Sequence, residues 1–110
     1  MKLTLGTLVL ALLLSPRLYA DARQDIVVYL KSSEEPTVKD ATWISHTMLA
    51  VGVVDDGSDR TGFAEYVCNL VRERGVRGVN VKVIDIVKLV NDDGFQNLSK
   101  RVDCETFKRW

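Results

Sequence analysis

Two cysteines, Cys68 and Cys104, constrain the fold of this 110-residue chain more than any other residues. In an exported chain they are most simply each other's partner, because exported proteins fold in an oxidising compartment. Closing the loop between them stabilises the folded state by about 3 to 4 kcal/mol in the chain-entropy model. A redox-active pair is the alternative, but Cys-x-x-Cys spacing is missing and Cys68 lies among apolar residues that disfavour a thiolate. We therefore predict one structural disulfide.

The N-terminus predicts export. Lys2 precedes an apolar run, Leu8 to Leu14, and the small residue Ala20 stands at a position suited to signal-peptide cleavage. A transmembrane anchor is the competing interpretation, but Pro16 and its neighbours end the apolar run well short of the roughly 20 residues that a bilayer requires. We expect a signal peptide over 1–20 and a single small domain over 21–110, exported to the periplasm or secreted, with no stable membrane insertion after cleavage.

The central part of the chain has the clearest helical pattern. Between Thr61 and Arg74, apolar residues recur at the spacing of one helix face and polar residues occupy the other face. The turn-rich stretch Asp55 to Asp59 offers capping oxygens at the start, and Gly75 can take the left-handed conformation that ends a helix. The sequence predicts a helix over about 60–74.

Two runs rich in β-branched residues predict strands, over about 25–31 and 79–87. In the second run Val79, Val81 and Val83 alternate with polar residues, although Val79, Val83, Ile86 and Val90 also fit helical spacing. The two runs could pair and form a sheet of two or more strands, on which the central helix would pack.

Two further helices are predicted from spacing alone, over about 38–51 and 94–102. The first contains many poor helix formers, so an extended conformation for Leu49 to Val54 is the alternative. The second would bring Cys104 back against the face that carries Cys68. The expected fold is thus α+β: a small sheet packed by two or three helices and held by one disulfide.

No pattern of residues predicts catalysis, a cofactor or a metal. His46 is the only histidine, which excludes zinc sites that use several imidazoles, and no nucleophile-elbow motif surrounds any serine. The acidic run Asp55 to Asp59 does not fit the register of an EF-hand loop, and a turn that precedes a helix explains it without an ion. We therefore assign no catalytic, cofactor-binding or metal-binding residue, and we expect a protein that is not an enzyme.

The balance of charged residues and the composition of the C-terminal tail indicate which kinds of partner to expect. Cleavage after Ala20 would remove Lys2 and Arg17 from the 15 basic residues and none of the 15 acidic ones, leaving 13 basic and 15 acidic side chains. This balance gives no reason to expect a nucleic acid as a partner. Phe107 and Trp110 are two aromatic residues in the C-terminal tail, and they are candidates for a partner-binding edge.

The sequence therefore favours a small, exported, disulfide-bonded protein that binds another, unidentified protein. An immunity or inhibitor protein of an exported toxin or hydrolase is one form of this hypothesis. The alternatives are a hydrolase that uses His46, and a subunit of an envelope assembly that offers the edge of a strand, for which Asp25 to Leu30 is the candidate.

Overall fold

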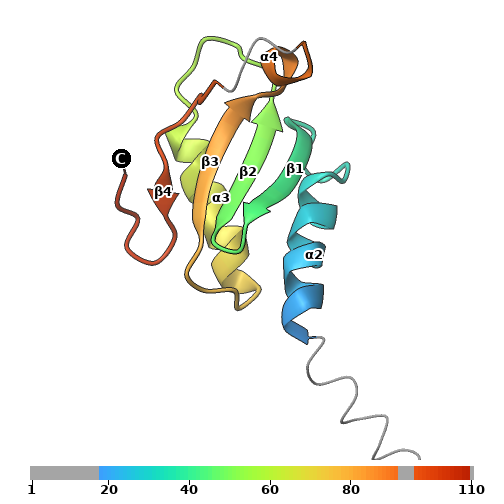
Figure 1. Cartoon of the computed structure of the whole chain (residues 1–110), viewed down its shortest axis with the longest axis vertical. Coiled ribbons are helices and arrows are strands. Elements are labelled where there is room, and N and C mark those ends of the chain that lie inside the picture. The colour runs from blue at the N-terminus through green and yellow to red at the C-terminus, as the bar shows by residue number, and fades with distance from the viewer. Residues whose placement is uncertain (1–17, 92–95, 110) are drawn as a thin grey trace, which may run out of the picture.

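The computed structural model describes residues 18–91 and 96–109, and within them the α+β class and the disulfide are confirmed. A four-stranded mixed sheet and three helices follow one another in the order α2 (Leu18–Leu30), β1 (Val38–Ser45), β2 (Met48–Val53), α3 (Thr61–Glu73), β3 (Asn80–Asp85), α4 (Ile86–Val90) and β4 (Val102–Asp103) (Figure 1). The strands lie side by side in chain order; β2 and β3 are parallel, and the two outer pairs are antiparallel.

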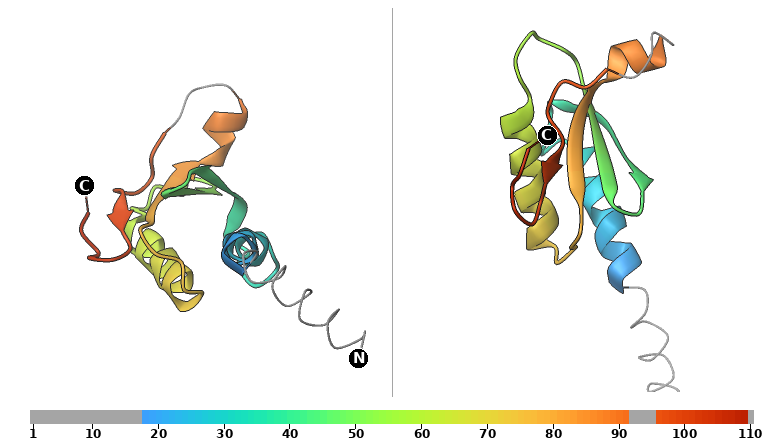
Figure 2. Two further views of the ribbon diagram at one scale, coloured as in Figure 1. Left: turned by 60° about the horizontal axis from the view of Figure 1, so that its bottom comes forward. Right: turned by 60° about the vertical axis from the view of Figure 1, so that its left-hand side comes forward.

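The helices divide between the two sides of the sheet (Figure 2). Helices α2 and α3 lie on one side, and the short α4 lies on the other. The hydrophobic core fills the space between the sheet and the first two helices, and its fully buried side chains include Ile26 and Leu30 of α2, Leu49 and Val51 of β2, and Val67 and Val71 of α3. Among the described residues, none of the helices has the length and hydrophobicity required to span a bilayer.

Helix α3 confirms the predicted helix and its predicted end. Its buried residues lie on one stripe that faces the sheet. Gly75 has a φ of 76°, and its N–H donates to the carbonyl oxygen of Arg72 at 2.9 Å, while Val76 N–H bonds to Val71 O. These two bonds form the Schellman motif, which satisfies the last carbonyls of a helix. Asp59 Oδ1 accepts from the N–H and the hydroxyl of Thr61 at the start of the helix.

The predicted strand over 25–31 is wrong, because residues 25–30 form the second half of α2 and Lys31 lies in the turn after it. Ile26 and Leu30 are buried in the core, whereas Val28 is 58% exposed. Positions i and i+4 share one helix face, and position i+2 points away from it, so the helix buries two of these three side chains. The contact with the core overrides the strand preference of the β-branched run.

The predicted helix over 38–51 is also wrong; the stretch forms the hairpin β1–β2, closed by the turn at His46 and Thr47. Its β-branched residues pair across the hairpin, as in Thr42 opposite Ala50 and Ala41 opposite Val51. The alternative of an extended Leu49 to Val54 is confirmed over β2. Residues that are poor helix formers pack well on a pleated surface, which explains the outcome.

The predicted strand over 79–87 is confirmed for β3, but the chain turns into α4 after Asp85. Asp85 is the N-cap of α4: its carboxylate accepts from the N–H groups of Val87 and Lys88 at 3.0 and 3.1 Å. A capping aspartate satisfies N–H groups at the start of a helix, so the strand ends at this residue and not two positions later.

The predicted helix over 94–102 is wrong for residues 96–102; residues 94 and 95 lie outside the described part of the chain. Backbone groups in this stretch bond to β3 in place of one another: Leu98 N–H donates to Val83 O at 2.8 Å, and Asp85 N–H donates to Gln96 O at 3.0 Å. The stretch runs antiparallel to β3 and leads into β4, whose residue Val102 pairs with Val81. The outer edge of β3 thereby obtains its hydrogen bonds from the C-terminal segment.

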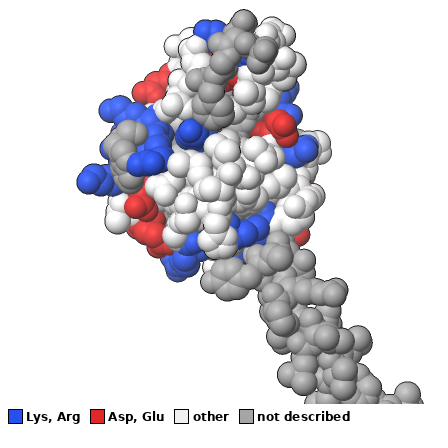
Figure 3. Space-filling model, in the orientation of Figure 1, with Lys and Arg blue, Asp and Glu red and all other residues white. Residues whose placement is uncertain are grey.

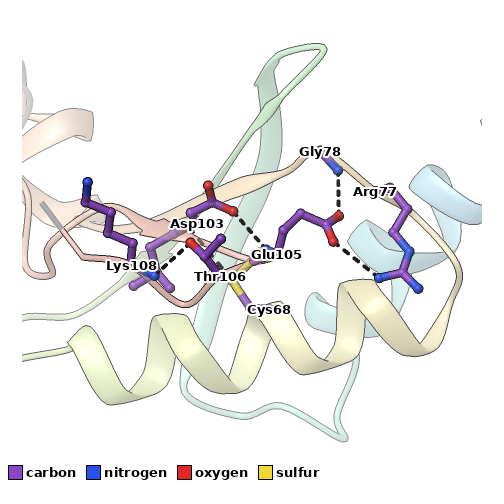
Figure 4. Close-up of a disulfide and its surroundings, with 9 residues drawn as sticks. Cys68, Arg77, Gly78, Asp103, Glu105, Thr106 and Lys108 are labelled. Carbon is purple, nitrogen blue, oxygen red and sulfur yellow. Dashed lines mark hydrogen bonds and ion pairs between the residues drawn. A yellow bond between two sulfur atoms is a disulfide. The ribbon is translucent and has the colours of Figure 1, made fainter.

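The disulfide joins α3 to the end of this segment (Figure 4). The sulfurs of Cys68 and Cys104 are 2.19 Å apart, both residues are buried, and Cys104 N–H donates to Val79 O at 2.9 Å. Beside the bond, Glu105 accepts from the N–H of Gly78 at 2.9 Å and pairs with Arg77 at 3.3 Å. The C-terminal segment is thus attached to α3 and to the start of β3.

Replacing Gly52 is expected to displace α4 from the sheet. An added Cβ would lie 3.0 to 3.3 Å from three side-chain atoms of Ile86, which is closer than normal contact. We expect Gly52→Ala to lower the free energy of unfolding by about 1 to 3 kcal/mol, measured by urea denaturation. The matched control is Gly62→Ala in α3, where an added Cβ meets no atom within 4 Å and should cost nothing or stabilise by less than about 1 kcal/mol. Equal effects of the two substitutions would contradict this contact.

Candidate binding surface

One side of the sheet is only partly covered. Side chains alternate between the faces of a strand, and Leu49, Val51 and Val53 of β2 all lie in the core. Met48, Ala50 and Gly52 therefore lie on the opposite face. We call this side the open face; from β1, β2 and β3 it comprises Asp40, Thr42, Ile44, Met48, Ala50, Gly52, Asn80, Lys82 and Ile84. Figure 1 views the sheet from this side, and Figure 3 shows that the centre of the same view is free of Lys, Arg, Asp and Glu.

The composition of β2 is that of a strand covered on both sides, and every residue of it except the half-buried Met48 is buried. Its sequence, Met-Leu-Ala-Val-Gly-Val, is apolar on both faces. Strands that face water on one side usually alternate apolar with polar residues, whereas uninterrupted apolar strands, common in parallel pairs such as β2–β3, are usually covered on both sides. The chain itself buries most of this face as well: Ala50 and Ile84 are only 2% and 4% exposed, and Gly52 is buried, so the apolar side chains left open are the exposed Ile44 and the half-buried Met48.

Helix α4 adds exposed apolar groups beside the open face. None of its five residues is buried, and Val87, Leu89 and Val90 are 46%, 41% and 75% exposed. At the other end of the face Ile44 is 49% exposed. A small groove of about 30 Å³ runs between α4 and the strands, and its walls include Ile86 and Leu89. Apolar groups that gather in this way are typical of interaction sites on soluble proteins.

A polar pocket lies at the β3 side of the open face. It has a volume of about 340 Å³ and is lined by Met48, Lys82, Asn97, Ser99 and Arg101. Of the described side chains that line it, two are cationic and none is acidic. The Ser99 hydroxyl accepts from Val83 N–H at 2.9 Å and donates to Lys100 O at 2.9 Å, so it holds the pocket wall against β3. We call this site the basic pocket.

The edges of the sheet are less suited to binding than its open face. On the outer strand β1, Asp40 Oδ1 accepts from the N–H of Ala41 at 2.9 Å and forms an ion pair with Lys31 at 3.5 Å. Charged side chains at an edge strand are a common protection against pairing with another chain. At the opposite edge of the sheet, Val102 of β4 forms a β-bridge with Arg109. The strand edge proposed over Asp25 to Leu30 does not exist, because these residues are helical.

His46 lies exposed at the turn of the β1–β2 hairpin. Its backbone carbonyl accepts from Arg23 Nη1 at 2.6 Å, and the Arg23 guanidinium lies over the ring of Trp43, 4.5 Å from its centroid. Within the described residues, no hydroxyl or carboxylate forms a hydrogen bond with the His46 imidazole. The position of His46 is explained by the turn and gives no support to a catalytic dyad.

The acidic turn over 55–59 uses its carboxylates within the turn. The hydroxyl and N–H of Ser58 donate to Asp56, and these hydrogen bonds, with the nearby Arg60, lower the pKa of Asp56 below 3.8. The hydroxyl and N–H of Thr61 donate to Asp59 and lower the pKa of that carboxyl in the same way. The turn borders an open, polar hollow that Asn97 and Lys100 also line. In the part of the chain that the structure describes, no group of three or more His, Cys, Asp or Glu residues is arranged to hold a metal ion.

The two aromatic residues proposed as a binding edge have different outcomes. The side chain of Phe107 is half-buried against the core, and the Arg72 guanidinium lies 5.6 Å from its ring centroid. Its backbone has a φ of 57° and belongs to the turn that brings Arg109 back to Val102. A role for Phe107 in binding stays a prediction, although its packing already has a structural reason. Trp110 lies outside the described residues.

A buried carboxylate connects the loop before β1 to α3. Glu35 is only 8% exposed, and the Tyr66 hydroxyl donates a hydrogen bond to its Oε1. The hydrogen bond to Glu35, together with burial, raises the pKa of the Tyr66 phenol above its usual value of 10.0. This contact holds the loop against the helix.

Removing the Tyr66 hydroxyl is expected to leave the Glu35 carboxylate without this donor. We expect Tyr66→Phe to lower the free energy of unfolding by about 1 to 3 kcal/mol, because an unsatisfied buried acceptor keeps its desolvation cost. Denaturation should be measured in the wild type, in Tyr66→Phe, in Glu35→Gln and in the double variant. The loss should be smaller in the Glu35→Gln background; the same loss in both backgrounds would show that the two side chains are not coupled.

Comparison with known proteins adds no further assignment: no family model, no curated protein and no solved structure matches this chain. The candidate surface is therefore judged on its own geometry. Sequence reasoning missed the open face, although one signal was present. The apolar residues of 48–53 fill both faces of a strand, and this pattern was concealed when the stretch was assigned to the end of a helix.

Proposed function

We propose that this chain is a small exported protein that binds another protein through its open face, and that it is not an enzyme. The observation that carries the proposal is the set of exposed apolar side chains on this side of the sheet: Val87, Leu89 and Val90 of α4, which are 46%, 41% and 75% exposed, and Ile44 of β1, which is 49% exposed. The N-terminal sequence supports export, and a disulfide is typical of small exported domains.

Affinity capture with matched variants tests the binding function. The tagged chain is produced in its native cells and recovered under native conditions, beside Ile44→Asp on the open face and Asn69→Asp on the exposed side of α3. A protein recovered with the wild type and with Asn69→Asp, but lost with Ile44→Asp, is the expected result. Recovery of no partner with the wild type would count against the function, and N-terminal sequencing that begins at Met1 would count against export.

Replacement of His46 separates this proposal from the hydrolase alternative. A binding protein should retain its partner in His46→Ala, because the imidazole lies at an exposed hairpin turn. An enzyme with His46 as its base would lose nearly all activity. A hydrolytic activity of the purified protein that disappears in His46→Ala would overturn the proposal.

A further inference from the structure

We propose that two copies of this chain exchange their C-terminal segments, residues 96–109. In the reduced chain the segment leaves the outer edge of its own β3 and occupies the same edge of a second copy. Oxidation then joins the two copies through bonds between Cys68 of one and Cys104 of the other. The inference goes beyond the proposed function and does not depend on the open face.

The segment is held by contacts that a second copy can supply equally well. Leu98 N–H donates to Val83 O at 2.8 Å. Cys104 N–H donates to Val79 O at 2.9 Å. Between these bonds β4 pairs with β3, and the side chain of Val102 is fully buried in the core. Each contact joins the segment to another part of the chain, so a second copy offers the same partner groups in the same places.

The end of the segment also has hydrogen bonds of its own. Asp103 N–H donates to Lys108 O at 2.9 Å, and Phe107 N–H donates to Asp103 O at 2.7 Å. Val102 and Arg109 form a β-bridge across the same turn. These bonds lie within the segment, so they remain in place when the segment passes from one copy to another.

Without the disulfide, the attachment of the segment is weak. Among the described strands β4 is the shortest, with two residues. The ion pairs of Arg109 with Glu65 and of Arg77 with Glu105 are partly or largely exposed, and exposed ion pairs contribute little to stability. We therefore expect the reduced chain to open at this segment before the rest of the fold is lost.

Opening leaves most of each copy intact. Helices α2 and α3 pack on β1, β2 and β3, and this core contains only two residues of the segment, Val102 and Cys104. The described part of the connection between β3 and the segment includes α4, and none of the five residues of α4 is buried. The outer edge of β3 therefore stays in place and can receive another segment.

The vacated edge is selective for this chain's own segment. Its occupant must place an apolar side chain at the fully buried position of Val102. It must also bring a thiol beside Cys68, as Cys104 does. A strand of another protein could pair with the backbone of the edge, but the segment of a second copy meets the two side-chain requirements as well.

Oxidation makes the exchange lasting. Each Cys68–Cys104 bond forms as its two thiols pass two electrons and two protons to one molecule of a disulfide oxidant, such as glutathione disulfide, which becomes two thiols. When the two thiols belong to different copies, the bond joins the copies. Their separation then requires reduction.

Complementary single-cysteine variants test the exchange. Cys68→Ser retains Cys104, and Cys104→Ser retains Cys68. The two full-length variants are mixed in the reduced form and oxidised with glutathione disulfide, and non-reducing electrophoresis measures the products. We expect a covalent heterodimer in about tenfold excess over the covalent homodimer of either variant alone, because exchange sets two thiols side by side only in the mixture. Equal yields in the three samples would indicate random collision and overturn the proposal.

Val102→Asp supplies the matched control, because the same substitution can be made in either chain of the mixture. In the Cys68→Ser chain it alters the segment that carries the thiol, and the buried carboxylate should lower the yield of heterodimer about tenfold or more. In the Cys104→Ser chain it alters the segment that has no thiol, so the yield should be retained. The same loss in both placements would contradict docking of the segment on the second copy.

Oxidation of the reduced wild type gives a readout that needs no substitution. The share of disulfide-linked dimer should rise with chain concentration, and peptide mass spectrometry should find Cys68–Cys104 bonds in the dimer. Monomer alone at every concentration, or a dimer joined by two copies of the same cysteine, would overturn the exchange. Binding of another protein at the open face is tested separately, by affinity capture with Ile44→Asp, so the two proposals can fail independently.

Discussion

Reduction of the Cys68–Cys104 disulfide is expected to lower the free energy of unfolding by about 3 to 4 kcal/mol. The bond closes a loop of 36 residues, and opening that loop increases the entropy of the unfolded chain. Domains of this size have total stabilities of about 5 to 15 kcal/mol, so the loss is a large share of the whole. The measurement is urea denaturation of the oxidised chain and of the chain held in a reducing agent that does not itself denature.

The Cys68→Ala, Cys104→Ala double variant provides the control for reduction. It should unfold near the midpoint of the reduced wild type, and the reducing agent should have no further effect on it. The structure shows which part is affected: β4 is only two residues long, the disulfide attaches the residue after it to α3, and the Cys104 to Val79 hydrogen bond attaches that residue to the start of β3. Identical midpoints of the oxidised and reduced wild type would show that the cysteines do not stabilise the native fold.

The second large effect is expected at Leu30 of α2. This side chain is fully buried, and we expect Leu30→Ala to cost about 2 to 5 kcal/mol through lost burial and the cavity left behind. The matched control on the same helix is Val28→Ala, at a position that is 58% exposed and should change stability by less than about 0.5 kcal/mol. Thermal or urea unfolding of the three chains measures both effects.

This pair of substitutions also separates the two interpretations of residues 25–31. In a strand, Val28 and Leu30 would share one face, so both replacements would be costly. In the helix, only Leu30 faces the core together with Ile26, while Val28 faces solvent. Comparable losses at positions 28 and 30 would contradict the helix; a large loss at Leu30 alone would confirm it.

The parts of the fold that could be predicted are those with several local signals in agreement. For α3, the apolar stripe, the turn before it and Gly75 after it all indicate the same helix. The cysteine pairing needed no geometry, because only two cysteines are present. The strand β3 was predicted from its alternating valines, and only its end was misplaced, because the capping role of Asp85 was not recognised.

The candidate site could not be predicted, because it is a property of the assembled sheet. Met48 and Ala50 belong to a stretch whose apolar spacing fits a helix as well as a strand, and their neighbours Thr42 and Lys82 come from two other strands. The basic pocket requires Lys82 and Arg101 to lie together, which follows only when residues 96–103 run beside β3. The acidic turn and His46, which the sequence singled out for examination, are explained by local structure.

Local sequence was therefore sufficient for the α+β class, for α3 with its glycine end, and for the identity of the two bonded cysteines. Long-range contacts decided whether residues 25–31, 38–51 and 96–102 became helix or strand. The physical reason is that a short run of apolar and β-branched residues can satisfy its backbone either within itself or with a neighbour. Burial of Ile26 and Leu30 selected the helix in residues 25–31. Hydrogen bonds between β1 and β2 selected the extended form in residues 38–51, and hydrogen bonds to β3 selected it in residues 96–102.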